Sequence, residues 1–268
     1  MNIENLEYLK ERMQYLGFGD KLNANLEKNI AAEKDQFNLS VQGEFNKNGK
    51  KEIVEYTVDF TKSKQADMYF ANNYKATLKN DDPEKEKSQV FYLNKGNGVT
   101  AKEAYNMLEG RAVHKKLTNR ENEPYEAWLQ LNFAQKDDKG SHKIQQYHSN
   151  WGYDLQKALE KHPVKALADP EKKDQLIKSL EKGNLVQVTY NRSEKDEKMF
   201  LEANPKERNI TLYDGDMRKQ FQGIKEFKEE KKDTKQGQDE NKSQQKSKDD
   251  DPKKEPDSQK PKGKRMSA

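Results

Sequence analysis

The sequence contains no cysteine and no long apolar run. Without thiols it can form neither a disulfide framework nor a thiolate metal site. Charges run through the N-terminal segment MNIENLEYLKERMQYLG, which lacks the apolar stretch of a signal peptide. No stretch approaches the roughly 20 apolar residues that a membrane span needs. We therefore expect a cytoplasmic protein that makes no contact with a membrane.

The signatures of common enzyme classes are also missing. The sequence has no HExxH motif, nucleophile elbow, complete P-loop or dinucleotide fingerprint. Its four histidines are spread along the chain, and His142 and His148 are the nearest pair. In one extended strand these two would lie about 20 Å apart, which is too far to share a metal ion. We therefore predict no catalytic residue, no metal site and no cofactor.

The net charge of +4 comes from one end of the chain. Residues 231–268 hold 12 Lys and Arg against 8 Asp and Glu, so this end alone accounts for the net charge. Residues 223–268 are almost entirely polar, and such a segment cannot bury enough apolar surface to offset its ordering entropy. We predict a disordered, charged tail over 223–268, following a body that is close to neutral.

Apolar residues near the N-terminus first recur at helical spacing and then alternate. Residues 3–16 and 20–32 each keep one apolar face, which predicts two helices joined by a short turn. Alternating apolar residues then predict an antiparallel meander of about four strands, each half buried. We assign residues 1–95 to a first domain that consists of a helical hairpin and this meander.

The central stretch, residues 91–116, contains a short strand, a glycine turn and a capped helix. Thr100 and Glu103 fit a capping box at the start of the helix, and Gly110 fits its C-terminal cap. The glycines of the turn are expected to supply positive φ angles. A glycine loop before a helix N-terminus can also bind an anion. The anion-binding candidates are Lys95, Gly96, Asn97 and Gly98, and the alternative is that the glycines only turn the chain.

Helices and strands also follow each other in blocks in the second half of the chain. We expect strands at 125–133 and 142–148, helices at 154–161 and 170–182, and then three short strands. Residues 96–222 therefore form a second, α+β domain, and the whole chain is predicted to be α+β with antiparallel sheets and segregated helices. Both halves place a helix before three strands, which suggests a duplicated unit.

The hairpin formed by residues 125–148 raises a nucleic-acid hypothesis. If Leu129 and Phe133 face the core, Trp128 faces the opposite side among amides and lysines. Aromatic rings among such groups can stack on bases while lysines hold phosphates. The alternative is that a helix covers this face and buries Trp128. The nucleic-acid-binding candidates are Trp128, Tyr147, Lys143 and Trp151.

Three long segments carry a family resemblance: FYLNKGNGVTAKEAYNMLEGRAVHKKLTN, QQYHSNWGYDLQKALEKHPVKAL and MFLEANPKERNITLYDGDMRKQ. They resemble the bacterial domain-of-unknown-function family 3945, which is carried on conjugative transposons and related mobile elements. The resemblance covers most of residues 1–222, and the family has no catalytic residues to carry over. It implies a mobile-element setting and contact with DNA, conjugation machinery or host defence.

We therefore predict a non-enzymatic accessory protein of a mobile genetic element, whose partner is an unidentified protein or DNA. One alternative is a single-stranded nucleic-acid-binding protein that uses the hairpin, and the other is an enzyme with an unrecognised site. An exposed pair of Trp128 and Tyr147 would favour the first alternative. A deep pocket lined by convergent polar groups would favour the second.

Overall fold

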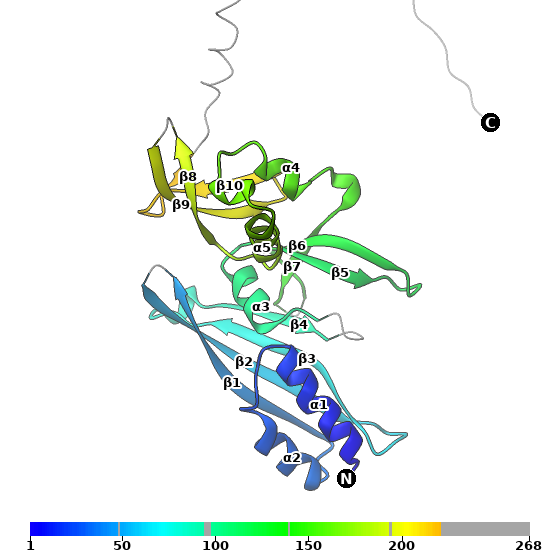
Figure 1. Ribbon diagram of the computed structural model, residues 1–268. Helices are drawn as coiled ribbons and strands as arrows, with labels where there is room; N and C mark the ends of the chain where they lie inside the picture. Colours follow the sequence, from blue (N-terminus) through cyan, green and yellow to red (C-terminus); the bar gives the residue numbers. More distant parts are fainter. Residues whose placement is uncertain (48, 94–97, 139, 193–194, 221–268) are drawn as a thin grey trace, which may run out of the picture. The chain divides into compact units, whose positions relative to one another are not determined.

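The computed structural model describes residues 1–47, 49–93, 98–138, 140–192 and 195–220. Five α-helices and three antiparallel sheets occur in this part of the chain, which confirms the predicted α+β class (Figure 1). The described residues all belong to one compact unit by their contacts. The predicted disordered tail, residues 223–268, lies outside the described residues.

The first sheet is a four-stranded meander beside two helices, as the sequence predicts (Figure 1). Apolar residues alternate along its second strand, so Val54, Tyr56, Val58 and Phe60 all point into the core. The elements are α1 (Ile3–Tyr15), α2 (Asn23–Ala31), β1 (Gln36–Lys47), β2 (Lys50–Lys62), β3 (Tyr69–Leu78) and β4 (Lys87–Tyr92), with strand order β1-β2-β3-β4.

The central helix α3 (Ala101–Leu108) begins with the predicted capping box. The Thr100 hydroxyl accepts from the Glu103 backbone N–H at 3.3 Å, and the Glu103 carboxylate accepts from the Thr100 N–H at 2.8 Å. Gly110 follows the helix at φ +89°, in the left-handed region that a C-terminal cap requires. The helix buries nearly its whole surface against the neighbouring strands.

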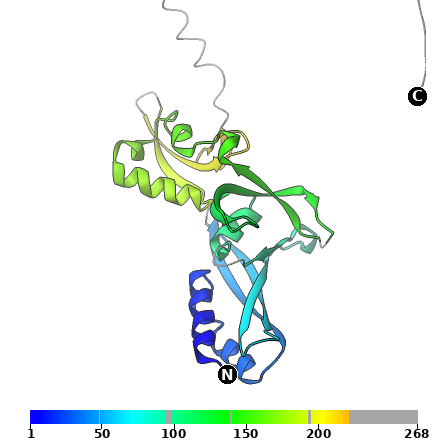
Figure 2. The ribbon, with the colours of Figure 1, turned by 90° about the vertical axis from the view of Figure 1, so that its right-hand side faces the viewer.

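A second sheet, of strand order β5-β6-β7, follows α3. It consists of β5 (Val113–Thr118), β6 (Pro124–Lys136) and β7 (His142–His148). Strand β5 was not expected, because the polar run around Lys115 masks the alternation of Val113 and Leu117. Strand β6 lines two hydrophobic cores: Leu129 and Leu131 belong to the first, whereas Trp128 belongs to the second. Figure 2 shows these strands in green.

The third sheet is again a four-stranded meander preceded by two helices. Its elements are α4 (Leu155–Leu159), α5 (Pro170–Glu181), β8 (Val186–Arg192), β9 (Lys195–Asn204), β10 (Asn209–Tyr213) and β11 (Lys219–Gln220), with order β11-β10-β9-β8. Short 3-10 turns occur at Pro83–Lys85, Ser149–Trp151 and Lys165–Ala168. Strand β8 therefore forms one edge of this sheet.

The buried residues do not divide at residue 95. The first core runs from Leu6 to Leu131, and the second from Ala112 to Leu212, so the two overlap along the chain. Helix α3 and strand β6 follow the expected boundary in sequence, yet both pack into the first core. Among the described residues, no helix is long and apolar enough to cross a membrane.

Candidate functional site

The aromatic pair of the predicted nucleic-acid face is buried. Trp128 and Tyr147 lie opposite each other on β6 and β7, with exposed fractions of 7% and 8%. The ring of Trp128 lies 5.1 Å from that of His114 and 5.3 Å from that of Tyr153. Residues of α4 and α5 complete the same core. Bases cannot stack on this pair, so the structure agrees with the alternative in which helices cover this face.

The other two hairpin candidates do not restore an exposed aromatic face. Lys143 is exposed but pairs with Asn132, several positions along the strand from Trp128. Trp151 is 40% exposed, and its Nε1 donates to the Pro205 carbonyl at 2.9 Å. The guanidinium of Arg208 lies 4.9 Å from the Trp151 ring. The four candidates thus do not form a common binding surface.

Three of the four anion-binding candidates of the central turn lie outside the residues that the structure describes: Lys95, Gly96 and Asn97. Gly98 is buried, and its φ is not in the left-handed region, which corrects the expectation of a positive φ there. The position is tight for a steric reason instead, because an added Cβ would lie 2.7 Å from Leu93 Cδ2 and the buried Leu93 side chain would have to shift. Gly98 therefore contributes to packing.

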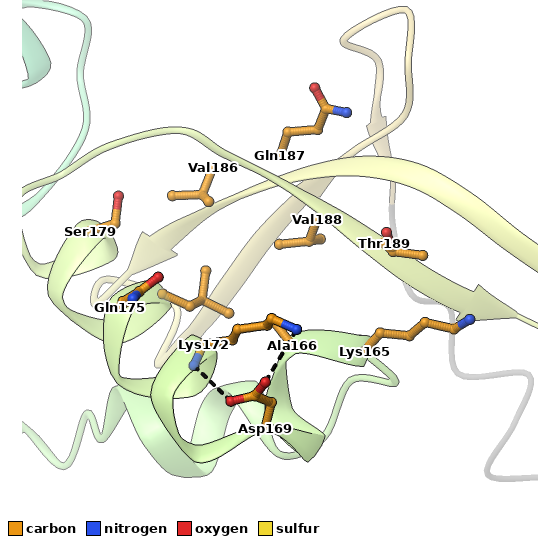
Figure 3. A pocket seen from close by; sticks show the side chains of 11 residues that line it. Lys165, Ala166, Asp169, Lys172, Gln175, Ser179, Val186, Gln187, Val188 and Thr189 are labelled. Carbon is orange, nitrogen blue, oxygen red and sulfur yellow. Dashed lines mark hydrogen bonds and ion pairs between the residues drawn. The ribbon is translucent and has the colours of Figure 1, made fainter.

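A groove lies between helix α5 and the edge strand β8 (Figure 3). Its volume is about 450 Å³. The strand wall comprises the four consecutive residues 186–189, whose side chains alternate between the two faces of the sheet. The hollow thus touches residues whose side chains lie on both faces of this edge strand. The opposite wall includes Leu176 and Ser179 of α5 and Ala166 of the preceding turn.

Backbone groups of β8 face this groove. The Asn191 N–H donates to the Pro163 carbonyl at 2.9 Å, away from β9. Because backbone groups alternate along a strand, those of Thr189 and Gln187 point to the same side. Val164 forms an isolated antiparallel bridge with Tyr190. Beyond this bridge, no described strand pairs with the Gln187 end of the edge.

A second hollow, of about 560 Å³, adjoins the groove. The two share Ser179, Val186 and Gln187 in their linings. The second hollow is polar, and its lining side chains include three cations: Lys47, Lys102 and Arg111. The second hollow therefore carries positive charge and lies next to the Val186 end of strand β8.

Arg111 fixes the wall of the second hollow rather than facing an empty space. Its Nε donates to the Gly183 carbonyl at 3.0 Å, and its terminal nitrogen donates to Asn106 Oδ1 at 2.8 Å. The Asn106 amide in turn donates to the Lys182 carbonyl at 2.6 Å. These bonds join the end of α3 to the end of α5, and Asn106 is fully buried. The hollow is thus held in shape before any ligand binds.

Lys102 occupies a different electrostatic position. Its ammonium lies 4.7 Å from the ring centre of Phe45 and 4.6 Å from that of Tyr105, two rings that stack at 4.1 Å. Partial burial and then the charge of Arg111 lower the pKa of Lys102. Burial, followed by the hydrogen bond to Glu52, raises the pKa of Tyr105. Within the described residues, no carboxylate lies at ion-pair distance from Lys102.

The histidines do not gather into a site. His162 is buried, with Nδ1 3.4 Å from the Tyr190 hydroxyl and Nε2 3.5 Å from Asn209 Oδ1. Burial lowers the pKa of His162, and it also lowers the pKa of His142. Within the described ranges, no three His, Asp or Glu residues come close enough to hold a metal ion.

The groove and the second hollow were not foreseen from the sequence. The alternation of Val186, Val188 and Tyr190 predicts β8, but it does not reveal which strand forms the edge. Lys102 belongs to a predicted capped helix, and its position over two stacked rings depends on Phe45, far away in sequence. Comparisons with family models, with curated proteins and with solved structures found no match for this chain.

Proposed function

We propose that this chain is a non-enzymatic accessory protein that binds an extended segment of a partner protein along the edge of β8. The groove between α5 and β8 carries this proposal. An added strand gains main-chain hydrogen bonds from a sheet edge and specificity from the walls of a neighbouring groove. Here Gln187 offers the backbone groups, while the partly exposed Ala166 and Val186 offer apolar contact.

The resemblance to family 3945 supports a mobile genetic element as the setting, with a partner among the proteins that such an element meets. DNA is the less favoured partner, because Trp128 and Tyr147 are buried. An enzymatic role is also less favoured. The described lining of the polar hollow contains no histidine, and its Tyr105 hydroxyl and Arg111 guanidinium are already bonded to neighbours.

A proline substitution separates strand addition from other kinds of binding. Gln187→Pro removes an N–H that faces the groove, and proline is tolerated in an edge strand at such a position. Gln187→Ala changes the same side chain and keeps the N–H. The full chain, with either substitution or none, is used to select from random peptides displayed on phage. Melting temperatures verify that each variant is folded.

Strand addition predicts that peptides enriched by the unsubstituted chain are retained by Gln187→Ala. The same peptides should bind Gln187→Pro about tenfold more weakly, because a peptide carbonyl left without its donor costs about 1–3 kcal/mol and about 1.4 kcal/mol is tenfold. Equal retention by both folded variants, or no enrichment of any peptide, would overturn the proposal.

A further inference from the structure

We propose that Lys102 binds the C-terminal carboxylate of the peptide that pairs with β8. This inference rests on the proposed function and specifies which end of the partner is recognised. It assigns the second hollow to the peptide terminus and the groove to the residues before it. The continuity of the two hollows at Ser179, Val186 and Gln187 makes a single occupant of both feasible.

The direction of the added strand follows from the existing bridge. Val164 pairs with Tyr190 in the antiparallel sense, so residues 163–164 already run along this edge towards the start of β8. A peptide that continues the same line is antiparallel to β8 as well. Antiparallel pairs are also the commoner kind overall. Such a peptide passes Gln187 and ends beside Val186, where the second hollow opens.

The charges around the two hollows single out one cation for an incoming carboxylate. Four cations are already paired: Lys165 with Asp196, Lys172 with Asp169, and both Lys47 and Arg111 with Glu109. Lys102 is the only cation among the described lining residues that has no carboxylate at ion-pair distance. The charge of a peptide terminus would complement it.

The surroundings of Lys102 strengthen this complementarity. The stacked rings of Phe45 and Tyr105 hold the ammonium by cation–π attraction and keep part of its surface from water. Lys102 is nevertheless exposed as a residue, so a carboxylate that enters the hollow can reach its ammonium. Asn184 lines the same hollow and can donate a further hydrogen bond through its amide.

The test compares peptides that end in a free carboxylate with peptides that do not. Selection against the full chain is run with one library displayed through its N-terminus, which leaves the C-terminus free, and one displayed through its C-terminus. Peptides enriched from either library are synthesised as free acids and as C-terminal amides, and their affinities are measured by fluorescence anisotropy. The variants are Lys102→Gln, Gln187→Pro and a control, Lys75→Gln, at an exposed lysine on β3.

The inference predicts enrichment from the library with free C-termini and about tenfold tighter binding of the acid than of the amide. Lys102→Gln should bring this ratio close to one, while Lys75→Gln leaves it unchanged. Gln187→Pro should weaken both peptide forms by a similar factor. An acid-to-amide ratio that survives Lys102→Gln, or peptides that bind equally as amides, overturns the inference but leaves strand addition standing. Failure of both libraries overturns both proposals.

Discussion

The two hydrophobic cores of this chain are built from similar elements but differ in how their polar groups and strand edges are satisfied. Each packs a pair of helices against a four-stranded antiparallel meander. The first core is rich in aromatic rings, and two of its fully buried tyrosines donate their hydroxyls to backbone carbonyls within it. Tyr56 donates to the Ala101 carbonyl at 2.7 Å, and Tyr74 donates to the Val99 carbonyl at 2.6 Å.

The second core is smaller, and the sheet that lines it ends in the edge strand β8, which lies beside a groove. Only the Val164 end of that edge is paired by a described segment, and the remainder faces α5 across the hollow. Unpaired strand edges invite pairing with another chain, and folded proteins commonly cover them or place charges on them. Residues 186–189 carry no charge. We infer that the first core provides stability, whereas the second provides the binding surface.

The strongest test of this comparison removes a ring from the first core. Tyr74→Ala should destabilise the chain by about 3–5 kcal/mol, because the ring is fully buried and packs within 5.4 Å of Phe18 and Phe91. Tyr92→Ala, at an exposed ring on β4, is the control and should change stability by less than about 0.5 kcal/mol. Chemical denaturation followed by circular dichroism measures both effects.

The same variant shows whether the two cores unfold together. Both tryptophans of the chain, Trp128 and Trp151, lie at the second core or beside it. Since β6 lines both cores, loss of the Tyr74 ring should shift the fluorescence transition as much as the circular dichroism transition. A fluorescence midpoint that stays in place while the other falls would show that the cores are independent, and the comparison would then describe two separate folding units.

A glycine at the junction of α3 and α5 gives a smaller effect. Gly183 has φ +74°, and a Cβ there would lie 2.8 Å from the Ala112 carbonyl and 2.9 Å from Val113 Cγ2. Gly183→Ala should therefore cost about 3 kcal/mol, from the left-handed backbone and the steric overlap together. Gly140 has φ +80° with no atom within 4 Å of its added Cβ, so Gly140→Ala should cost only about 1–2 kcal/mol.

The difference between these glycine variants tests the wall of the second hollow. The Gly183 carbonyl accepts from Arg111, so a shift at this position also displaces that guanidinium. If both variants lose the same stability in urea titrations, the close approach at Gly183 is relieved by a small movement. The wall would then be more adaptable than its hydrogen bonds imply.

The sequence predicts most elements of the fold because their signals are local. Thr100 and Glu103 identify the start of α3 through a four-residue motif, and the alternation from Val54 to Phe60 identifies β2. The polar strand β5 lacks such a signal, since its inward residues are separated by charged ones. The surroundings of Trp128 were open to two interpretations, because only the tertiary arrangement decides whether helices cover that face.

The proposed binding site depends on long-range contacts throughout, which explains why the sequence does not reveal it. The edge position of β8 is set by the order of strands in the sheet, which no local pattern encodes. Lys102 meets Phe45 across more than 50 residues of sequence, and Arg111 meets Gly183 across 72. At Gly98 the sequence pattern predicted a positive φ angle. The structure instead shows that the close approach of the Leu93 side chain restricts this position.

The smallest expected effect concerns the pH dependence of the second core. Burial lowers the pKa of His162 below its usual value of 6.5, so the folded state binds its proton less readily than the unfolded state. The stabilisation from this neutral imidazole is fully present above the unfolded pKa of about 6.5 and is lost as the pH falls from there through the lower folded pKa. The melting temperature should therefore drop between about pH 7.5 and about pH 5.5.

His162→Gln should reduce this drop, whereas His148→Gln, at an exposed histidine, should preserve it. A drop of the same size in His162→Gln would mean that the acid sensitivity arises elsewhere, with the His142 imidazole, whose pKa burial also lowers, as the next group to substitute.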